Sequence, residues 1–150
     1  MGEITSYQSD VVAWAQQQAH WIRTRQFDKL DLANIAEEIE DVGKGEKREL
    51  ASRMAVLLAH LLKWQYQPQL QSKSWQRTIR VQRKSIWTNL EDTPSLKTQL
   101  SDARWLQATW DDAVALAIKE TQLDTFPESC PWTTQDFLEE NWLPLAADKA

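Results

Sequence analysis

Apolar residues recur at steps of three and four positions along most of the chain, and this spacing is what most limits its fold. The strongest row contains Leu50, Met54, Leu57, Leu58, Leu61 and Leu62. Residues at this spacing share one face of an α-helix, which has about 3.6 residues per turn. The row therefore predicts a central helix over residues 46–66, which Pro68 ends.

Weaker rows of the same kind predict further helices. We expect them over residues 10–25, 32–42, 74–90 and 95–121, with a short last helix from Thr133 to Glu140. Asp31 and Ser95 suit the N-terminal caps of two of these helices. Gly43 and Gly45 suit a C-terminal cap that separates the second helix from the third.

Composition supports the same fold class. The 150 residues include 3 glycines and 5 prolines, which leaves few turns and favours a few long helices over many short strands. No alternating run typical of a strand and no internal repeat is present. The sequence predicts an all-α protein, a compact bundle of about five to six helices, as one domain over residues 1–150.

Charge is divided unevenly along the chain. Residues 1–49 carry a net charge of −4, residues 50–90 carry +7 with no acidic residue, and residues 91–150 carry −8. Four bases in the middle segment lie at steps of four, three and four, and therefore on one side of a helix; we call them the basic face: Lys73, Arg77, Arg80 and Lys84. With the adjacent Arg83, they are the candidate anion-binding residues. These bases could bind an anionic partner, or acidic helices of the same chain could neutralise them. We favour neutralisation within the chain, because it carries its own acids.

Two other features could carry chemistry. Glu37, Glu38 and Asp41 share the polar side of the second expected helix, where clustered carboxylates could hold a hard cation or act as acid and base. His60 borders the leucine row and could pair with one of these carboxylates. A solvated acidic face and a structural histidine are the alternatives that we favour.

Common catalytic motifs are absent from the sequence. It contains no phosphate loop, nucleophile elbow, dinucleotide fingerprint or zinc-ligand spacing. Cys130, the single cysteine, lies near two prolines and no basic residue, which does not favour a catalytic thiolate. We predict no metal and no cofactor, and a lone cysteine favours a cytoplasmic location.

Several runs of residues together resemble one protein family. The most specific are Glu37 to Glu40 and His60 to Pro68; the others include Phe27-Asp28, Leu30 to Leu32, Ser74-Trp75, Pro94 to Leu96 and Phe126 to Trp132. They resemble the bacterial domain-of-unknown-function family numbered twenty-nine, common in cyanobacteria, from about Tyr7 to Pro144. The resemblance implies an all-helical fold, and it implies neither an established activity nor catalytic residues.

A protein-interaction module is the function that we favour from the sequence. The chain has 9 tryptophans, and Trp and Arg are common interface anchors. Trp105, Trp110, Trp132 and Trp142 are candidate contacts, although Trp110 also suits the core. The partner is another protein or a second copy of the chain. Nucleic acid is a weaker alternative because the net charge is −5, and no apolar stretch is long enough for a membrane.

The alternative function is a metal-assisted hydrolase or nuclease. In this hypothesis Glu37, Glu38, Asp41 and His60 hold the cation, and the arginines of residues 77–83 hold phosphate. It requires His60 to lie within one water-bridged contact of a carboxylate in the second expected helix.

Overall fold

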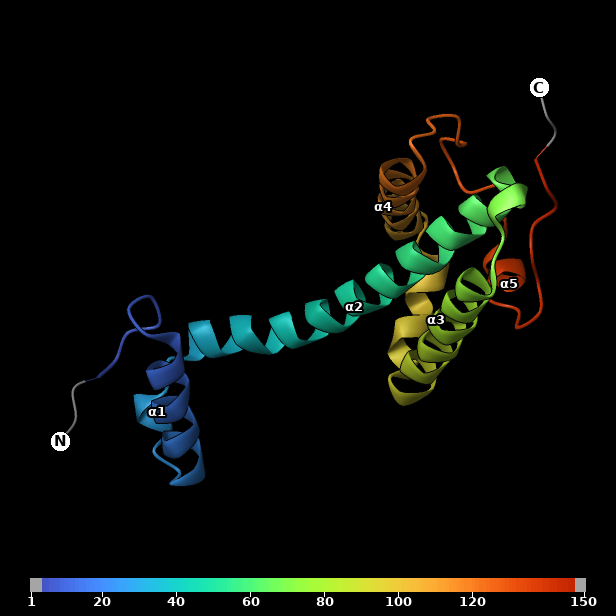
Figure 1. Cartoon of the computed structure of the whole chain (residues 1–150). Helices are drawn as coiled ribbons and strands as arrows, with labels where there is room; N and C mark the ends of the chain where they lie inside the picture. Colours follow the sequence, from blue (N-terminus) through green and yellow to red (C-terminus); the bar gives the residue numbers. More distant parts are fainter. Residues whose placement is uncertain (1–3, 148–150) are drawn as a thin grey trace. The chain divides into compact units, whose positions relative to one another are not determined.

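The chain is helical throughout the residues that the structure describes. The computed structural model describes residues 4–147, so the predicted range of 1–150 extends beyond the described residues at both ends. Its α-helices and 3-10 helices are shown in chain order in Figure 1: α1 (Val11–Arg23), η1 (Phe27–Lys29), α2 (Leu32–Tyr66), η2 (Pro68–Leu70), α3 (Lys73–Asp92), η3 (Pro94–Ser101), α4 (Ala103–Thr121) and α5 (Thr134–Phe137). Residues 4–147 contain no strand, which confirms the predicted all-α class.

Two compact units divide the chain. They are Met1–Gly45 and Glu46–Ala150. The first contains α1, η1 and the start of α2, and the second contains the remaining helices. A single domain over the whole chain stays a prediction.

Polar contacts, more than apolar burial, hold the first unit together. Trp14 and Gln18 are the buried residues of α1. The Trp14 indole N–H donates to a carboxylate oxygen of Asp31 at 3.0 Å, and the Gln18 side-chain oxygen accepts from the Asp31 backbone N–H at 2.8 Å. Asp31 also accepts from the backbone N–H of Asn34 at 3.4 Å, which is the N-terminal cap predicted for this helix.

Helix α2 corrects the prediction of two helices separated by glycines. It runs without a break from Leu32 to Tyr66. Gly43 and Gly45 lie inside it, and no described glycine has a positive φ, so neither forms the left-handed cap that we expected. Glycine in a helix costs about 1 kcal/mol relative to alanine. Extending a helix that is already nucleated on both sides adds one hydrogen bond per residue, which offsets this cost.

The apolar core lies in the second unit. Figure 1 shows α3, α4 and α5 around the C-terminal part of α2. Leu50, Leu57 and Leu61 of α2 are fully buried, as expected for the central helix. The rest of this unit adds further large buried side chains, Ile79, Ile86, Leu90, Leu96, Trp110, Phe137 and, just after α5, Leu138.

The helix predicted over residues 95–121 also needs correction. The chain forms η3 first, and α4 begins at Ala103. The Asp102 side chain caps α4 by accepting from the backbone N–H groups of Arg104 and Trp105, each at 3.1 Å. A strong acceptor at residue 102 starts a new helix there, so Ser95 does not cap a long one.

The last helix is shorter than predicted. Thr133 caps α5 as expected, by accepting from the backbone N–H of Asp136 at 3.1 Å. The helix ends at Phe137 and not at Glu140. The backbone oxygens of Phe137 and Glu140 accept hydrogen bonds from Arg83, so these groups are satisfied without further helical hydrogen bonds. In the described part of the chain, no helix has the length and apolar character needed to cross a bilayer.

Candidate functional site

The outward side of α3 carries the basic face. Ser72 caps the helix by accepting from the backbone N–H of Trp75 at 3.2 Å. The helical repeat then places the four bases on one side, and all four are exposed: Lys73, Arg77, Arg80 and Lys84. Ile79, Ile86 and Leu90 lie on the buried side. The helix therefore divides its charged and apolar residues between water and the core.

The internal charge match that we favoured from the sequence stays a prediction, because the second expected helix and α3 belong to different units. Residues 4–147 contain two ion pairs, Arg53 with Glu49 at 2.9 Å and Lys63 with Glu120 at 2.7 Å. Neither involves the basic face. Its four positive charges are therefore free to meet charges outside the described residues.

Arg83 has a different environment from the other candidate anion-binding residues. It is 4% exposed and donates three hydrogen bonds to backbone carbonyl oxygens. These join Nε to Phe137 at 2.9 Å, Nη1 to Glu140 at 3.1 Å and Nη2 to Trp142 at 2.6 Å. Burial lowers the pKa of Arg83, and the charge of Glu139 opposes that shift. The side chain fastens the segment after α5 to α3, which leaves few donors for an external anion.

A groove of about 600 Å³ lies beside the basic face. Its lining residues are Arg80, Arg83, Lys84, Trp87, Thr88, Glu91 and Glu140. Trp87 donates its indole N–H to the backbone oxygen of Leu138 at 2.9 Å while 46% of the residue stays exposed. An oriented, half-exposed indole next to free cations is a common interface anchor.

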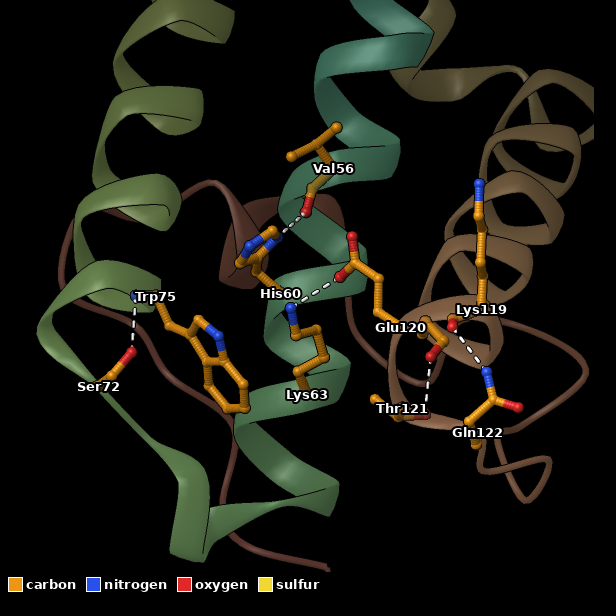
Figure 2. Close-up of polar contacts among 10 residues, drawn as sticks. Val56, His60, Lys63, Ser72, Trp75, Lys119, Glu120, Thr121 and Gln122 are labelled. Carbon is orange, nitrogen blue, oxygen red and sulfur yellow. Dashed lines mark hydrogen bonds and ion pairs between the residues drawn. The ribbon is translucent and has the colours of Figure 1, made fainter.

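His60 belongs to a cluster that joins three helices (Figure 2). Lys63 of α2 forms an ion pair with Glu120 of α4, and its ammonium lies 4.8 Å from the ring centroid of Trp75 of α3. His60 Nδ1 lies 2.9 Å from the backbone oxygen of Val56. A carbonyl oxygen can only accept, so Nδ1 carries a proton and Nε2 holds the lone pair of the neutral ring.

The cluster favours a neutral His60. The pKa of His60 is lowered, mainly by burial and also by the charge of Lys63. The hydrogen bond to Val56 and the charge of Glu120 act in the opposite direction. The cation of Lys63 is covered by Trp75 and neutralised by Glu120. Sequence analysis found His60 but not these partners, because Lys63 and Glu120 are 57 positions apart and form no local pattern.

The residues of the hydrolase hypothesis are divided between the two units. Glu37, Glu38 and Asp41 belong to the first unit, and His60 belongs to the second. Among the described residues, no group of three His, Cys, Asp or Glu side chains is arranged to hold a metal. The alternative of a metal-assisted hydrolase or nuclease therefore has no assembled site.

Glu38 instead accepts a short hydrogen bond from the hydroxyl of Tyr7. This bond is the largest of the effects that raise the pKa of Tyr7 to about 12. Glu37 and Asp41 are exposed, as in the solvated acidic face that we favoured. The local contact ties the segment before α1 to α2.

Cys130 and the C-terminal tryptophans mainly serve packing. Burial raises the pKa of Cys130, whose Sγ lies 3.3 Å from the backbone oxygen of Trp132, so the thiol is not activated. Trp110 is buried, and Trp132 stacks edge-on between Trp110 and Trp142, with both centroid distances 5.6 Å. Of the tryptophans considered as contacts, Trp110 is thus a core residue. Trp87, by contrast, is 46% exposed and lies beside the basic face.

Fold and site together define a small all-helical protein with an exposed basic helix face and, among its described residues, no group of His, Cys, Asp or Glu side chains arranged to hold a metal. The family model described as "Domain of unknown function DUF29" matches residues 6–143, and the chain belongs to this family. The chain is also similar to the crystal structure of an α-helical protein of unknown function from Rhodospirillum rubrum. The two share 24% identity over 93% of each chain, with a TM-score of 0.57, which supports the fold. No curated protein matches the chain.

Proposed function

We propose that this protein is an interaction module whose basic face binds an acidic surface of a protein partner. The observation that carries the proposal is that the four bases of α3 are exposed and have no ion-pair partner within residues 4–147. Like charges three and four residues apart repel one another by about 0.2–0.5 kcal/mol per pair. An acidic partner removes that repulsion and adds attraction.

The groove supports a protein partner over a simple anion. Trp87 and Val81 expose 46% and 49% of their surfaces on the same helix as the four bases. Protein interfaces combine aromatic and apolar anchors with charged residues at the rim. Arg80, Lys84 and Trp87 offer this combination within two turns of α3.

Nucleic acid is the less favoured partner. Glu91 and Glu140 line the groove, where they repel phosphates. The chain as a whole carries a net charge of −5. Trp64 and Tyr66, which could stack on bases, are packed against the core. We also propose a cytoplasmic location, because Cys130 is the single cysteine.

Fluorescence anisotropy with two labelled probes tests the proposal. The probes are a poly-L-glutamate peptide and a single-stranded oligo(dT) of equal charge. We expect the wild-type protein to bind the peptide more tightly at low salt, with affinity falling steeply as salt screens the charges. The double variant R77E/R80E should weaken peptide binding at least about tenfold, or roughly 1.4 kcal/mol.

A matched control reverses two exposed bases outside α3. The variant K97E/K119E changes the net charge by the same amount and should keep most of the affinity. Equal losses in the two variants would mean that net charge, and not the basic face, governs binding. Tighter binding of oligo(dT) would favour the nucleic-acid alternative, and the absence of peptide binding at low salt would refute the proposal.

A further inference from the structure

The apolar row at the start of α2 is open to solvent. Leu32, Ile39 and Val42 are 68%, 67% and 70% exposed, whereas Ile35 between them is half-buried. Every residue from 39 to 49 is exposed. Large apolar side chains at helical spacing with this exposure mark a surface that another element covers.

The helix itself needs such cover. An isolated helical segment of this length is marginal in water, and most helices in proteins are stabilised by packing an apolar face. Gly43 and Gly45 lower the intrinsic stability of this part of α2 further. A partner packed on the exposed apolar residues would therefore stabilise this part of α2.

The charges around this row are complementary to the basic face. Glu37, Glu40 and Asp41 are exposed, and none has an ion-pair partner among the described residues. On α3, four bases accompany two half-exposed apolar side chains, Val81 and Trp87. One helix thus offers apolar residues with acids, and the other offers apolar residues with bases.

We propose that the start of α2, residues 32–42, binds the basic face of α3 in a second copy of this chain. This inference rests on the proposed function, because it identifies the acidic partner of the basic face. Each copy carries both surfaces, so this contact can form between copies without another partner.

Complementary charge reversal tests the pairing by sedimentation velocity over a range of protein concentrations. The wild-type protein should self-associate, more weakly at high salt. R77E/R80E alone and E37K/D41K alone should each weaken self-association at least about tenfold. An equimolar mixture of the two variants should restore it, because the unchanged acids of the first meet the unchanged bases of the second, and the reversed pair is complementary again.

Two matched controls separate this contact from general effects. K97E/K119E should self-associate like the wild-type protein. Ile39→Asp should weaken association, whereas Val12→Asp, which also places a charge at an exposed apolar position of the first unit, should not. Circular dichroism of every variant checks that the helices persist.

The outcomes distinguish the inference from the proposed function. A wild-type protein that is monomeric at all concentrations but binds poly-L-glutamate through Arg77 and Arg80 overturns the inference and leaves the proposed function standing. Self-association that both charge reversals leave unchanged, or a mixture that fails to restore it, also overturns the inference. A protein that neither self-associates nor binds the peptide refutes both.

Discussion

Replacement of Arg83 by methionine should release the C-terminal segment from α3 and lower the free energy of unfolding. Methionine keeps most of the apolar stem and removes the guanidinium. That group donates three hydrogen bonds, at 2.9, 3.1 and 2.6 Å, to the backbone oxygens of Phe137, Glu140 and Trp142. With its side chain only 4% exposed, Arg83 makes these bonds away from water.

The expected loss follows from the number of bonds. A hydrogen bond from a charged donor contributes about 1.5–3 kcal/mol. The full sum is not expected, because two of the three acceptors lie after the end of α5 and can bind water once the segment moves. We therefore expect Arg83→Met to lower the free energy of unfolding by about 3 kcal/mol, which is the value for one or two such bonds.

Urea denaturation measures the loss, and limited proteolysis after Glu139 and Glu140 shows where it occurs. Cleavage at these sites should be faster in Arg83→Met than in the wild-type protein. Arg80→Met, at an exposed position one turn earlier, should change stability by less than about 0.5 kcal/mol. Equal stability and equal cleavage rates in the two variants would refute the assignment of Arg83 to the C-terminal segment.

Three further predictions concern α2 and α3. Gly43→Ala should increase the stability of α2 by about 0.5–1 kcal/mol, because an added Cβ meets no atom within 4 Å. Hydrogen exchange measures this gain. If Gly43 were a left-handed cap, the substitution would lower the stability instead. Burial lowers the pKa of His60, so the unfolded chain binds more protons below its ordinary pKa of about 6.5. Stability in urea should therefore fall from pH 8 to pH 5.5, and His60→Gln should reduce that fall. The Asn89 amide nitrogen is buried without a hydrogen-bond partner in the described structure. Asn89→Leu should therefore raise the free energy of unfolding by roughly 1 kcal/mol, which a higher midpoint of thermal unfolding would show.

Helix positions were predictable wherever the apolar residues at helical spacing are the residues that the structure buries. Leu50, Leu57 and Leu61 meet both conditions, and the helix through them was correctly predicted to end at Tyr66, although it begins at Leu32. Gly43 was misleading because glycine adopts helical and left-handed φ angles with similar ease, so its identity does not decide between a cap and a helix interior. The start of α4 was missed because Asp102 competes with Ser95 as a cap, and the sequence does not rank the two.

The candidate site was predictable in its periodicity but not in its contacts. The spacing of the bases correctly placed them on one side of α3. Arg80 and Arg83 are chemically identical and nearly adjacent, yet one is exposed and the other is buried. Backbone oxygens more than 50 residues later make this difference, and no local pattern encodes them.

The placement of charge along α3 is itself an argument for an external partner. The N-terminus of a helix is electropositive and its C-terminus electronegative, so acids near the start and bases near the end stabilise it, each by about 0.3–1 kcal/mol. Helix α3 has the opposite order, with Lys73 as its first residue and Glu91 and Asp92 as its last two. This order lowers the stability of the helix, and no ion pair within residues 4–147 compensates the basic face. Sequences depart from locally favourable choices mainly where function requires it. The order of charges along α3 therefore supports the proposal that the basic face binds an acidic partner.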